Sequence, residues 1–398
     1  MYRWKDTIGP IHERREQENL WGYHQSVGLG YFEFFQFCED IGAKPLPIVP
    51  AAVSCQHSGQ TSSTGQEGLP MDQMAEYVQE VLDLVEWANG PATSEWGAKR
   101  AAAGHPEPFG LEYLGVGNED AQTPAFRERF AMIYSVVKAK HPEITVIGTV
   151  GPFPDGEDFE AGWQFADRLA VKMVDEHYYR PPQWFLEHTA RYDTYDRSNS
   201  LVYVGEYAAH DRDRRTTLRA ALAEAAFMTG LERNGDVVRL TSYAPLLGKL
   251  GHCQWNPNLI YFSNTEVFPT VSFYVQQMFG ANQGDRYLPA TLTVTPQPAE
   301  GECVAVSTVV DSTTGDVIIK LVNASSTPRL AQIELRGGVA FQSEATRIVL
   351  AGELNDSNSA EHPDRVVPAV SQFTAGKSFV YEAAPHSFTV LRLKTAAQ

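Results

Sequence analysis

A regular alternation of apolar runs and helical segments through the middle of the chain is the feature that most constrains the fold. Strand-like runs at 111–118, 145–150, 173–179, 201–207 and 237–243 are separated by helical segments at 125–140, 163–171, 183–191 and 218–231. Repeated β-α units of this length predict a parallel sheet. Their number favours a closed (β/α)8 TIM barrel over an open sheet.

The residues before this region extend the same pattern less regularly. Residues 31–41 and 72–87 are predicted helices, and 44–53 is a predicted buried strand. The end of the second helix, residues 84–87, is expected to pass into a further short strand. The count is then about seven strands where a barrel has eight, and the first barrel strand is expected to lie before residue 1. Residues 54–68 are predicted to be a mobile Ser/Gly/Gln loop.

The pattern changes near residue 285. Short apolar runs follow, separated by Gly, Pro, Ser and Asn, at 291–294, 304–310, 317–323, 331–335, 347–350 and 387–393. Strands without intervening helices are typical of a β-sandwich. We therefore predict a catalytic barrel domain over 1–285 and a C-terminal all-β sandwich domain over 286–398.

Composition limits the partners of the protein. The net charge of −17 argues against a nucleic-acid or anionic-membrane partner and suits a neutral substrate, although acidity that only keeps the chain soluble explains it equally well. No stretch is long and apolar enough to span a membrane, the first residues do not form a signal peptide, and the location stays open. Cys38, Cys55, Cys253 and Cys303 form no C-x-x-C pair and are interpreted as free thiols, with one disulfide as the lesser alternative.

Two glutamates stand at the ends of predicted parallel strands. Glu119 follows the run 111–116, and Glu206 follows the run 201–204. The carboxyl ends of barrel strands carry the chemistry of that fold, and enough sequence for three β-α units separates the two. A carboxylate pair about 5 Å apart cleaves a glycosidic bond with retention of configuration. A single Glu would be better explained as a cap or ion-pair partner, but two at matching strand ends favour a catalytic pair.

Residues near these glutamates suit the same chemistry. Strand alternation places His177 and Tyr179 on one face, where a Tyr hydroxyl can hold a carboxylate and a His can tune its affinity for a proton. A lone His is more often a core residue. Asn118 can hydrogen-bond a sugar hydroxyl or serve the turn. Motifs for phosphate loops, H-E-x-x-H zinc sites, G-x-S-x-G nucleophiles and Cys/His metal sites are absent from the sequence, so no metal is expected.

Six motifs, in order along essentially the whole chain, resemble the α-L-arabinofuranosidases of glycoside hydrolase family fifty-one. They are residues 2–10 (YRWKDTIGP), 115–120 (GVGNED), 175–179 (DEHYY), 205–208 (GEYA), 242–246 (SYAPL) and 274–279 (YVQQMF). The resemblance implies a (β/α)8 barrel with an attached β-sandwich. It also implies a retaining double displacement without a cofactor.

The resemblance also implies roles for particular residues. Glu119 maps to the acid/base and Glu206 to the nucleophile, with Asn118, His177 and Tyr179 as substrate-binding neighbours. A looser alignment adds Gln254 and Trp255, which fall where the family lines its sugar pocket. The implied function is release of terminal non-reducing α-L-arabinofuranosyl residues from arabinose-containing glycans, part of L-arabinose metabolism. The resemblance leaves a homo-oligomer open.

One departure keeps other readings open. The family has a barrel strand with a Pro-Gly-Gly motif and a substrate-binding Glu before Arg3-Trp4-Lys5, and this sequence contains no such segment. An N-terminally truncated, inactive chain with residual carbohydrate binding is therefore one alternative. Another retaining glycosidase of the same barrel type, a β-xylosidase or an endoglucanase, is a second. The carboxylate pair alone excludes neither.

Overall fold

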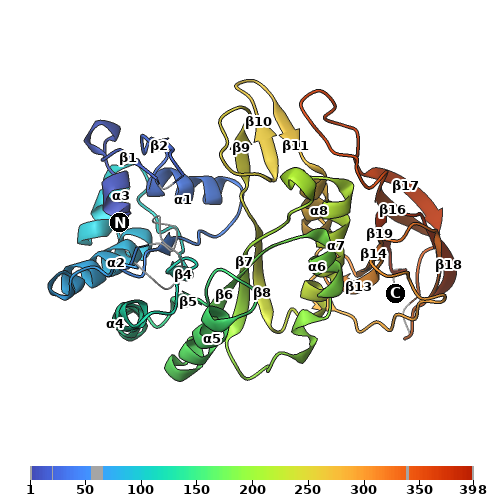
Figure 1. The fold of residues 1–398 in the computed structure, drawn as a ribbon, viewed down its shortest axis with the longest axis horizontal. Coiled ribbons are helices and arrows are strands. Elements are labelled where there is room, and N and C mark those ends of the chain that lie inside the picture. Colours follow the sequence, from blue (N-terminus) through green and yellow to red (C-terminus); the bar gives the residue numbers. More distant parts are fainter. Residues whose placement is uncertain (1, 20, 55–65, 338–339, 397–398) are drawn as a thin grey trace. The chain divides into compact units, whose positions relative to one another are not determined.

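The middle of the chain forms a sheet whose strands follow one another in chain order, β3-β4-β5-β6-β7-β8 (Figure 1). The computed structural model describes residues 2–19, 21–54, 66–337 and 340–396. The strands of this sheet are β3 (Ile48–Val49), β4 (Tyr113–Val116), β5 (Thr145–Thr149), β6 (Met173–Arg180), β7 (Leu201–Ala209) and β8 (Val238–Tyr243). From β3 to β6 each neighbouring pair is parallel. The predicted parallel sheet is confirmed, with six strands among the described residues.

One predicted strand is wrong. Residues 84–87 belong to helix α2 (Met74–Asn89), which continues two residues past them. Val81, Leu84, Val85 and Ala88 are all buried, at the three- and four-residue spacing of a helix face. The apolar run is therefore the continuing helix face, and it contributes no strand to the sheet. The strand predicted over 44–53 is also shorter than expected, because only β3 forms there.

Contacts divide the chain into two units, and β6 and β7 each have residues in both. The first unit comprises Met1–His177 and Ser198–Tyr203, and the second comprises Tyr178–Arg197 and Val204–Gln398. The first unit contains α1 (Tyr31–Asp40), α2, α3 (Glu95–Ala102), α4 (Pro124–Lys140) and α5 (Glu157–Leu169). Thr123 caps α4 by accepting a hydrogen bond from the Phe126 amide, an N-cap of the usual kind.

The N-terminal residues are anchored on α2. They form the short helices η1 (Trp4–Thr7) and η2 (Ile11–Glu13) and the hairpin β1 (Gln17–Glu18) and β2 (His24–Gln25). The Trp4 ring is buried, lies 5.8 Å from the Trp87 ring, and donates its indole N–H to the Glu80 carbonyl at 2.9 Å. Arg3 pairs with Glu80, and Lys5 pairs with Asp83. These contacts attach the predicted irregular segment to the helical layer.

The second unit begins with the ends of β6 and β7 and continues through β8 into further helices and sheets. Its helices are α6 (Pro182–Glu187), η4 (Arg191–Thr194), η5 (Arg212–Arg214), α7 (Leu218–Arg233) and α8 (Val271–Gly280). A three-stranded sheet β11-β10-β9 comprises β9 (Leu247–Lys249), β10 (Ile260–Phe262) and β11 (Val267–Pro269). Neither this sheet nor α8 was predicted from the sequence.

The C-terminal residues form the expected all-β region. A six-stranded sheet, β12-β13-β14-β19-β16-β17, accompanies the two-stranded sheet β15-β18. The strands are β12 (Arg286–Tyr287), β13 (Val304–Asp311), β14 (Asp316–Asn323), β15 (Arg329–Glu334), β16 (Glu344–Ala351), β17 (Ala369–Thr374), β18 (Ser378–Ala383) and β19 (Ser387–Leu393). Inward side chains of both sheets, among them Ile319, Leu391 and Tyr381, share one core. The domain boundary at 285/286 stays a prediction.

The strand predicted over 291–294 is wrong. These residues have no regular structure, and most of them are exposed. Pro289, Pro296 and Pro298 flank them, and proline cannot donate to a strand ladder. Alternation of Thr with Leu and Val was therefore not sufficient to form a strand. β17 and β18, in contrast, form without having been predicted.

A buried ion pair attaches the sandwich to α7 within the second unit. Lys320 on β14 has no exposed surface and donates to Glu232 on α7 and to the Asn282 carbonyl. Ser307 on β13 donates to the other Glu232 oxygen at 2.5 Å. Breaking such a pair leaves a buried charge uncompensated. The side chains therefore hold the sandwich sheet against the helix.

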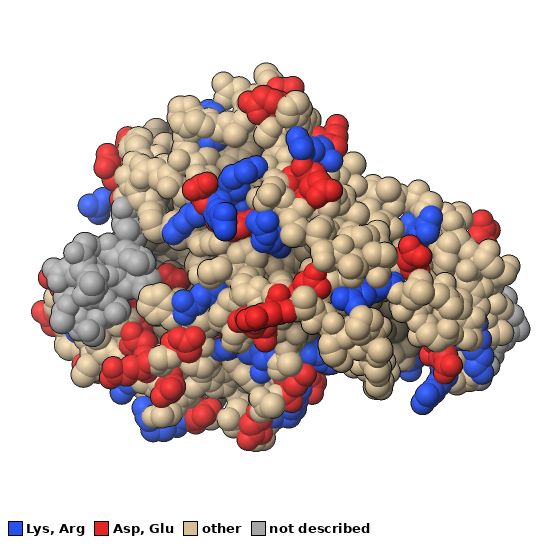
Figure 2. Space-filling model, turned by 45° about the vertical axis from the view of Figure 1, so that its right-hand side comes forward, with Lys and Arg blue, Asp and Glu red and all other residues tan. Residues whose placement is uncertain are grey.

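The free thiols predicted from the sequence are found wherever the structure describes a cysteine. Cys38, Cys253 and Cys303 are free thiols, while Cys55 and residues 55–65 of the predicted mobile loop lie outside the described residues. Within the described part of the chain, none of the helices has the length and apolarity needed to cross a bilayer. On the face drawn in Figure 2, basic side chains are interspersed with acidic ones.

Candidate active site

Glu119 lies on a tight turn directly after β4. Gly117 has φ +86° and Glu119 has φ +53°, both in the left-handed region. The Asn118 amide donates to Asp120 Oδ2 at 3.0 Å, and a Cβ placed on Gly117 would lie 2.5 Å from that same oxygen. A non-glycine residue in this region carries backbone strain, and such residues are concentrated at functional sites. The predicted strand-end position of Glu119 is confirmed, with a conformation that only the structure could show.

A chain of three ionisable groups contains Glu119. His177 Nδ1 lies 2.9 Å from Glu119 Oε1, and His177 Nε2 lies 3.0 Å from Asp175 Oδ2. The imidazole is 1% exposed and the Glu119 side chain is 14% exposed. An imidazolium would donate to both carboxylates, whereas a neutral ring would donate to one of them only. The imidazole therefore connects Glu119 to Asp175 through its two ring nitrogens.

Asp175 was missed as a site residue by the sequence analysis. It precedes His177 by two positions on β6, so strand alternation places both side chains on the same face. The same alternation that indicated His177 and Tyr179 could have found it. Asp175 is buried and fixes the orientation of the imidazole.

Asp120 is a second carboxyl group next to Glu119. Burial raises the pKa of Asp120 to about 7, against the lowering effect of the Asn118 amide, and the adjacent Glu119 adds a smaller increase. A group with this pKa changes its charge near neutral pH. It lies behind the turn that carries Glu119, and its accepted hydrogen bond helps to form that turn.

Glu206 has different surroundings. Glu206 was predicted at the end of its strand, and this is wrong: it lies within β7, which continues as regular strand to Ala209. The Tyr179 hydroxyl donates to Glu206 Oε2 at 2.7 Å. A phenol keeps its proton across the neutral range, so this bond can orient a carboxylate without competing for its charge. The predicted role of Tyr179 in holding a carboxylate has the required geometry.

Aromatic rings pack around Tyr179. His210 stacks on it with ring centroids 5.1 Å apart and an interplanar angle of 19°, and Trp255 meets it edge-on at 5.4 Å. Burial, with a smaller contribution from Arg214, lowers the pKa of His210 to about 4, so this imidazole is neutral at ordinary pH. The Arg214 guanidinium lies 4.4 Å from the centre of the Trp255 ring. His210 was not identified from the sequence.

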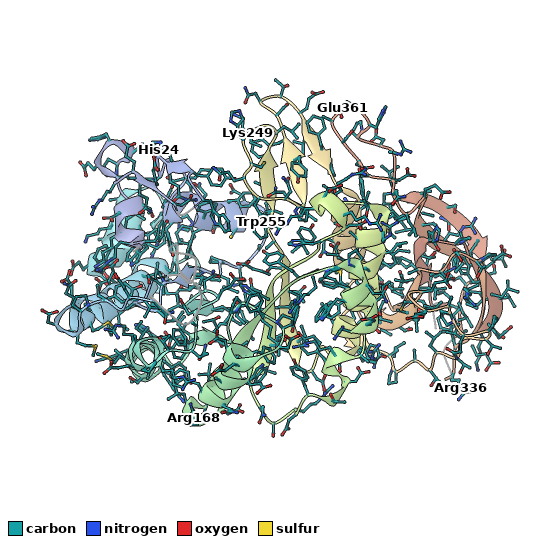
Figure 3. The ribbon with its side chains drawn as sticks, viewed as in Figure 1. His24, Arg168, Lys249, Trp255, Arg336 and Glu361 are labelled. Carbon is teal, nitrogen blue, oxygen red and sulfur yellow. The ribbon has the colours of Figure 1, made fainter. Side chains whose placement is uncertain are left out.

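The remaining predicted residues lie at the edges of these two clusters. Asn118 is half-buried in the turn beside Glu119. Exposed Gln254 and half-buried Trp255, the latter labelled in Figure 3, stand on the connection between β9 and β10. Buried Asn258 donates to the Trp255 carbonyl at 2.7 Å and so fixes this connection. The structure brings the Trp255 ring to that of Tyr179, while a place for Gln254 and Trp255 in a sugar pocket stays a prediction.

Comparison with known proteins agrees with this organisation. Residues 1–197 match the model of the α-L-arabinofuranosidase 1 domain, and 192–387 match that of the α-L-arabinofuranosidase C-terminal domain. An extracellular exo-α-L-arabinofuranosidase of Streptomyces chartreusis is 48% identical over 74% of this chain and 34% of its own length. α-L-arabinofuranosidase 2 of Arabidopsis thaliana is 31% identical over 100% of this chain and 56% of its own.

Solved structures show the same fold. An arabinose-bound family fifty-one α-L-arabinofuranosidase has a TM-score of 0.86 at 33% identity, over 99% of this chain and 62% of that one. The Thermotoga maritima α-L-arabinofuranosidase, in complex with arabinose, has a TM-score of 0.77 over 99% of this chain and 84% of that one. At 17% identity, this second likeness shows the fold alone.

A parallel sheet with helices followed by an all-β region is the fold that this chain shares with these glycoside hydrolase structures. Within that class, the chain belongs to the α-L-arabinofuranosidases of glycoside hydrolase family fifty-one. It spans between 34% and 56% of the length of the curated relatives described above.

Proposed function

We propose that this chain carries the catalytic residues of a retaining exo-α-L-arabinofuranosidase. Its substrates are terminal non-reducing α-L-arabinofuranosyl units of arabinose-containing polysaccharides or oligosaccharides. The observation that carries the proposal is the different bonding of two carboxylates, one after β4 and one within β7: Glu119 contacts the His177–Asp175 pair, and Glu206 accepts from the Tyr179 hydroxyl. An acid/base must exchange a proton, and a nucleophile must remain an oriented anion.

In the first step, a Glu206 carboxylate oxygen attacks the anomeric carbon as the bond to the leaving oxygen breaks. Glu119 gives its proton to that oxygen, and a covalent glycosyl-enzyme forms. In the second step, Glu119 takes a proton from water, and the water oxygen attacks the same carbon and releases Glu206. The two inversions together retain the configuration of the sugar. The His177–Asp175 pair holds Glu119 in place and exchanges hydrogen bonds with it as its charge changes.

Substrate contacts are proposed on both clusters. The side-chain carboxamide of Asn118 can bind a sugar hydroxyl next to the acid/base. Trp255 and Tyr179 offer aromatic surface next to the nucleophile, with Gln254 as a polar neighbour. Aromatic rings that keep a polar tip suit a sugar, which is apolar on one face and polar at its edge.

The test is hydrolysis of 4-nitrophenyl α-L-arabinofuranoside by the unmutated chain, Glu119→Ala and Glu206→Ala. The matched control is Glu334→Ala, which removes an exposed strand glutamate from the sandwich. We expect turnover by the unmutated chain and the control, and a loss of about 10³-fold or more in the two site variants. With methanol as acceptor, retention would give methyl α-L-arabinofuranoside.

Two results would contradict the proposal. A folded chain that does not cleave the arabinofuranoside would support the inactive alternative. Preferential cleavage of 4-nitrophenyl β-D-xyloside would support a β-xylosidase.

A further inference from the structure

A third glutamate, Glu224, is buried behind the strand that carries Glu206. It lies on α7 and has no exposed surface. Its Oε1 accepts a hydrogen bond from the Ala209 amide at 2.8 Å. Ala209 is the last residue of β7, three positions after Glu206. The carboxyl group thus connects the end of the nucleophile strand to the helix behind it.

The polar side chains that interact with Glu224 are uncharged. Tyr207 on β7 and Tyr243 on β8 face it, and Ser272 on α8 interacts with both the Glu224 carboxyl and the Tyr243 hydroxyl. Glu224 Oε2, Ser272 Oγ and Tyr243 Oη are buried, and none of the three forms a hydrogen bond of full geometry. No cation compensates the carboxylate among these neighbours.

A buried carboxyl group with hydroxyl neighbours and no cation favours its neutral form. Burial raises the pKa of Glu224 to about 8. As a neutral acid, the group can do two things at once: Oε1 accepts from Ala209, and the proton on Oε2 can be donated to a hydroxyl such as that of Ser272. This joins β7 to α7 and α8, which lie side by side in Figure 1.

We propose that Glu224 is a positioning residue for the nucleophile, acting as a neutral acid that holds the carboxyl end of β7 and with it Glu206. The inference rests on the proposed function, because it concerns the geometry of attack by Glu206. Small displacements of a reacting group have large effects on rate, and 1 Å can lower it by about 10²-fold. Loss of the hydrogen bond between Glu224 and Ala209 should therefore lower kcat and leave KM nearly unchanged.

The experiment compares Glu224→Gln and Glu224→Leu with the unmutated chain. A glutamine amide can accept from Ala209 and donate from its nitrogen, so we expect kcat within about 3-fold of the unmutated value. Leucine is similar in size and can do neither. We expect Glu224→Leu to lower kcat about 10- to 100-fold with KM within about 2-fold.

Glu232 provides a matched control on the same helix. It is a largely buried carboxylate two turns further along α7, but it binds Lys320 and Ser307 of the sandwich and not β7. We expect Glu232→Gln to lower the melting temperature and leave kcat unchanged. If Glu224→Leu does not fold, Glu224→Asp replaces it, because this variant keeps the acid and withdraws it by one methylene.

Hydrogen exchange at the Ala209 amide gives a second readout that does not require turnover. We expect faster exchange in Glu224→Leu and unchanged protection in Glu224→Gln. Unchanged kcat and unchanged exchange in folded Glu224→Leu would overturn the inference, as would equal losses of kcat in Glu224→Gln and Glu224→Leu. If the unmutated chain itself does not turn over, the proposed function fails, while exchange at Ala209 still decides whether Glu224 holds the strand end.

Discussion

Glu119 follows strand β4 and Glu206 lies within strand β7 of the same sheet, and the protein holds the two carboxylates by different contacts. Glu119 stands on a turn with two left-handed residues and contacts a His–Asp pair. Glu206 stands in regular strand and accepts from a tyrosine with aromatic neighbours. Groups that titrate suit a residue that must gain and lose a proton. The proposed nucleophile must stay an oriented anion, and the Tyr179 hydroxyl can orient it by donating to it.

The surroundings of Glu119 and Glu206 nevertheless share one feature. In each case a buried carboxyl group accepts a hydrogen bond from a backbone amide near the glutamate: Asp120 accepts from Asn118, one residue before Glu119, and Glu224 accepts from Ala209, three residues after Glu206. Burial raises the pKa of Asp120 to about 7 and that of Glu224 to about 8. At pH values below these pKa values each acid is neutral, so it fixes the backbone and adds little charge near the glutamate.

The largest effect should come from chemical rescue, which separates the two roles directly. We expect Glu206→Ala to lose about 10⁴-fold or more in kcat. With a dinitrophenyl leaving group, Glu119→Ala should still form the glycosyl-enzyme, and added azide should restore turnover. The product anomer, measured by NMR, gives the assignment: a retained azide from Glu119→Ala and an inverted azide from Glu206→Ala. Exchanged products would reverse the two roles.

The next largest effect should be the pH dependence of the unfolding free energy that Asp120 and Glu224 cause. In the unfolded chain, Asp120 and Glu224 lose their protons near their ordinary pKa values of 3.8 and 4.5, whereas the folded chain keeps these protons up to about pH 7 and pH 8. The unfolded state thus binds fewer protons in these windows, and the unfolding free energy falls as pH rises through them. Asp120→Asn and Glu224→Gln should each remove about 4 kcal/mol of this decline.

Denaturant unfolding at pH 4.5 and pH 8.5 measures that difference. Each amide variant should gain stability relative to the unmutated chain as pH rises, and the gain should level off above the folded pKa. A constant difference between variant and unmutated chain at both pH values would contradict the neutral form of that acid.

Replacement of His177 should selectively affect the proton donation by Glu119. We expect His177→Ala to lower kcat/KM about 100-fold on alkyl arabinofuranosides, whose leaving oxygen needs a proton, and much less on the dinitrophenyl glycoside. His141→Ala is the control, because His141 pairs with exposed Glu143 on the surface. Equal losses on both substrates would mean that His177 does not act through Glu119.

Gly117→Ala tests the strain in the turn that carries Glu119. Alanine at φ +86° is strained, and its Cβ would lie 2.5 Å from Asp120 Oδ2. We expect a loss of about 2 kcal/mol in unfolding free energy, together with lower activity. Gly104→Ala is the matched control, since it has φ +104° but open space around the new Cβ. Equal effects of the two substitutions would show that contact with Asp120 is unimportant.

Tyr179→Phe should have the smallest effect. It removes the hydroxyl that donates to Glu206 and keeps the ring that stacks on His210. A hydrogen bond to a charged group contributes about 1.5–3 kcal/mol, and at the lower end of that range we expect kcat to fall about 10-fold on every leaving group. Tyr134→Phe, which removes a hydroxyl bonded to the Ala170 carbonyl, should leave kcat unchanged. A loss of kcat that depends on the leaving group would indicate that Tyr179 acts on the acid/base Glu119 and not on Glu206.

Element types followed from local patterns where a pattern was long and unambiguous. The helix α7 and the strands β5, β6 and β7 lie close to their predicted positions, because each has one period over many residues. Residues 84–87 and 291–294 did not form their predicted strands, because a short apolar run is compatible with more than one structure. The outcome there depended on neighbours: α2 continued, and the prolines around 291–294 prevented a ladder.

The sequence by itself determined that Glu119 follows a strand and that His177 and Tyr179 share a face, since both facts follow from the length of an apolar run and a period of two. It placed Glu206 at a strand end, whereas β7 continues three residues past it. Only the tertiary structure decided what each carboxylate touches. His177 reaches Glu119 from two strands further on, and Glu224 reaches Ala209 from the following helix. Such contacts depend on which segments pack together, and burial then sets the pKa of Asp120, His210 and Glu224. No local pattern encodes that burial, because it comes from atoms contributed by distant parts of the chain.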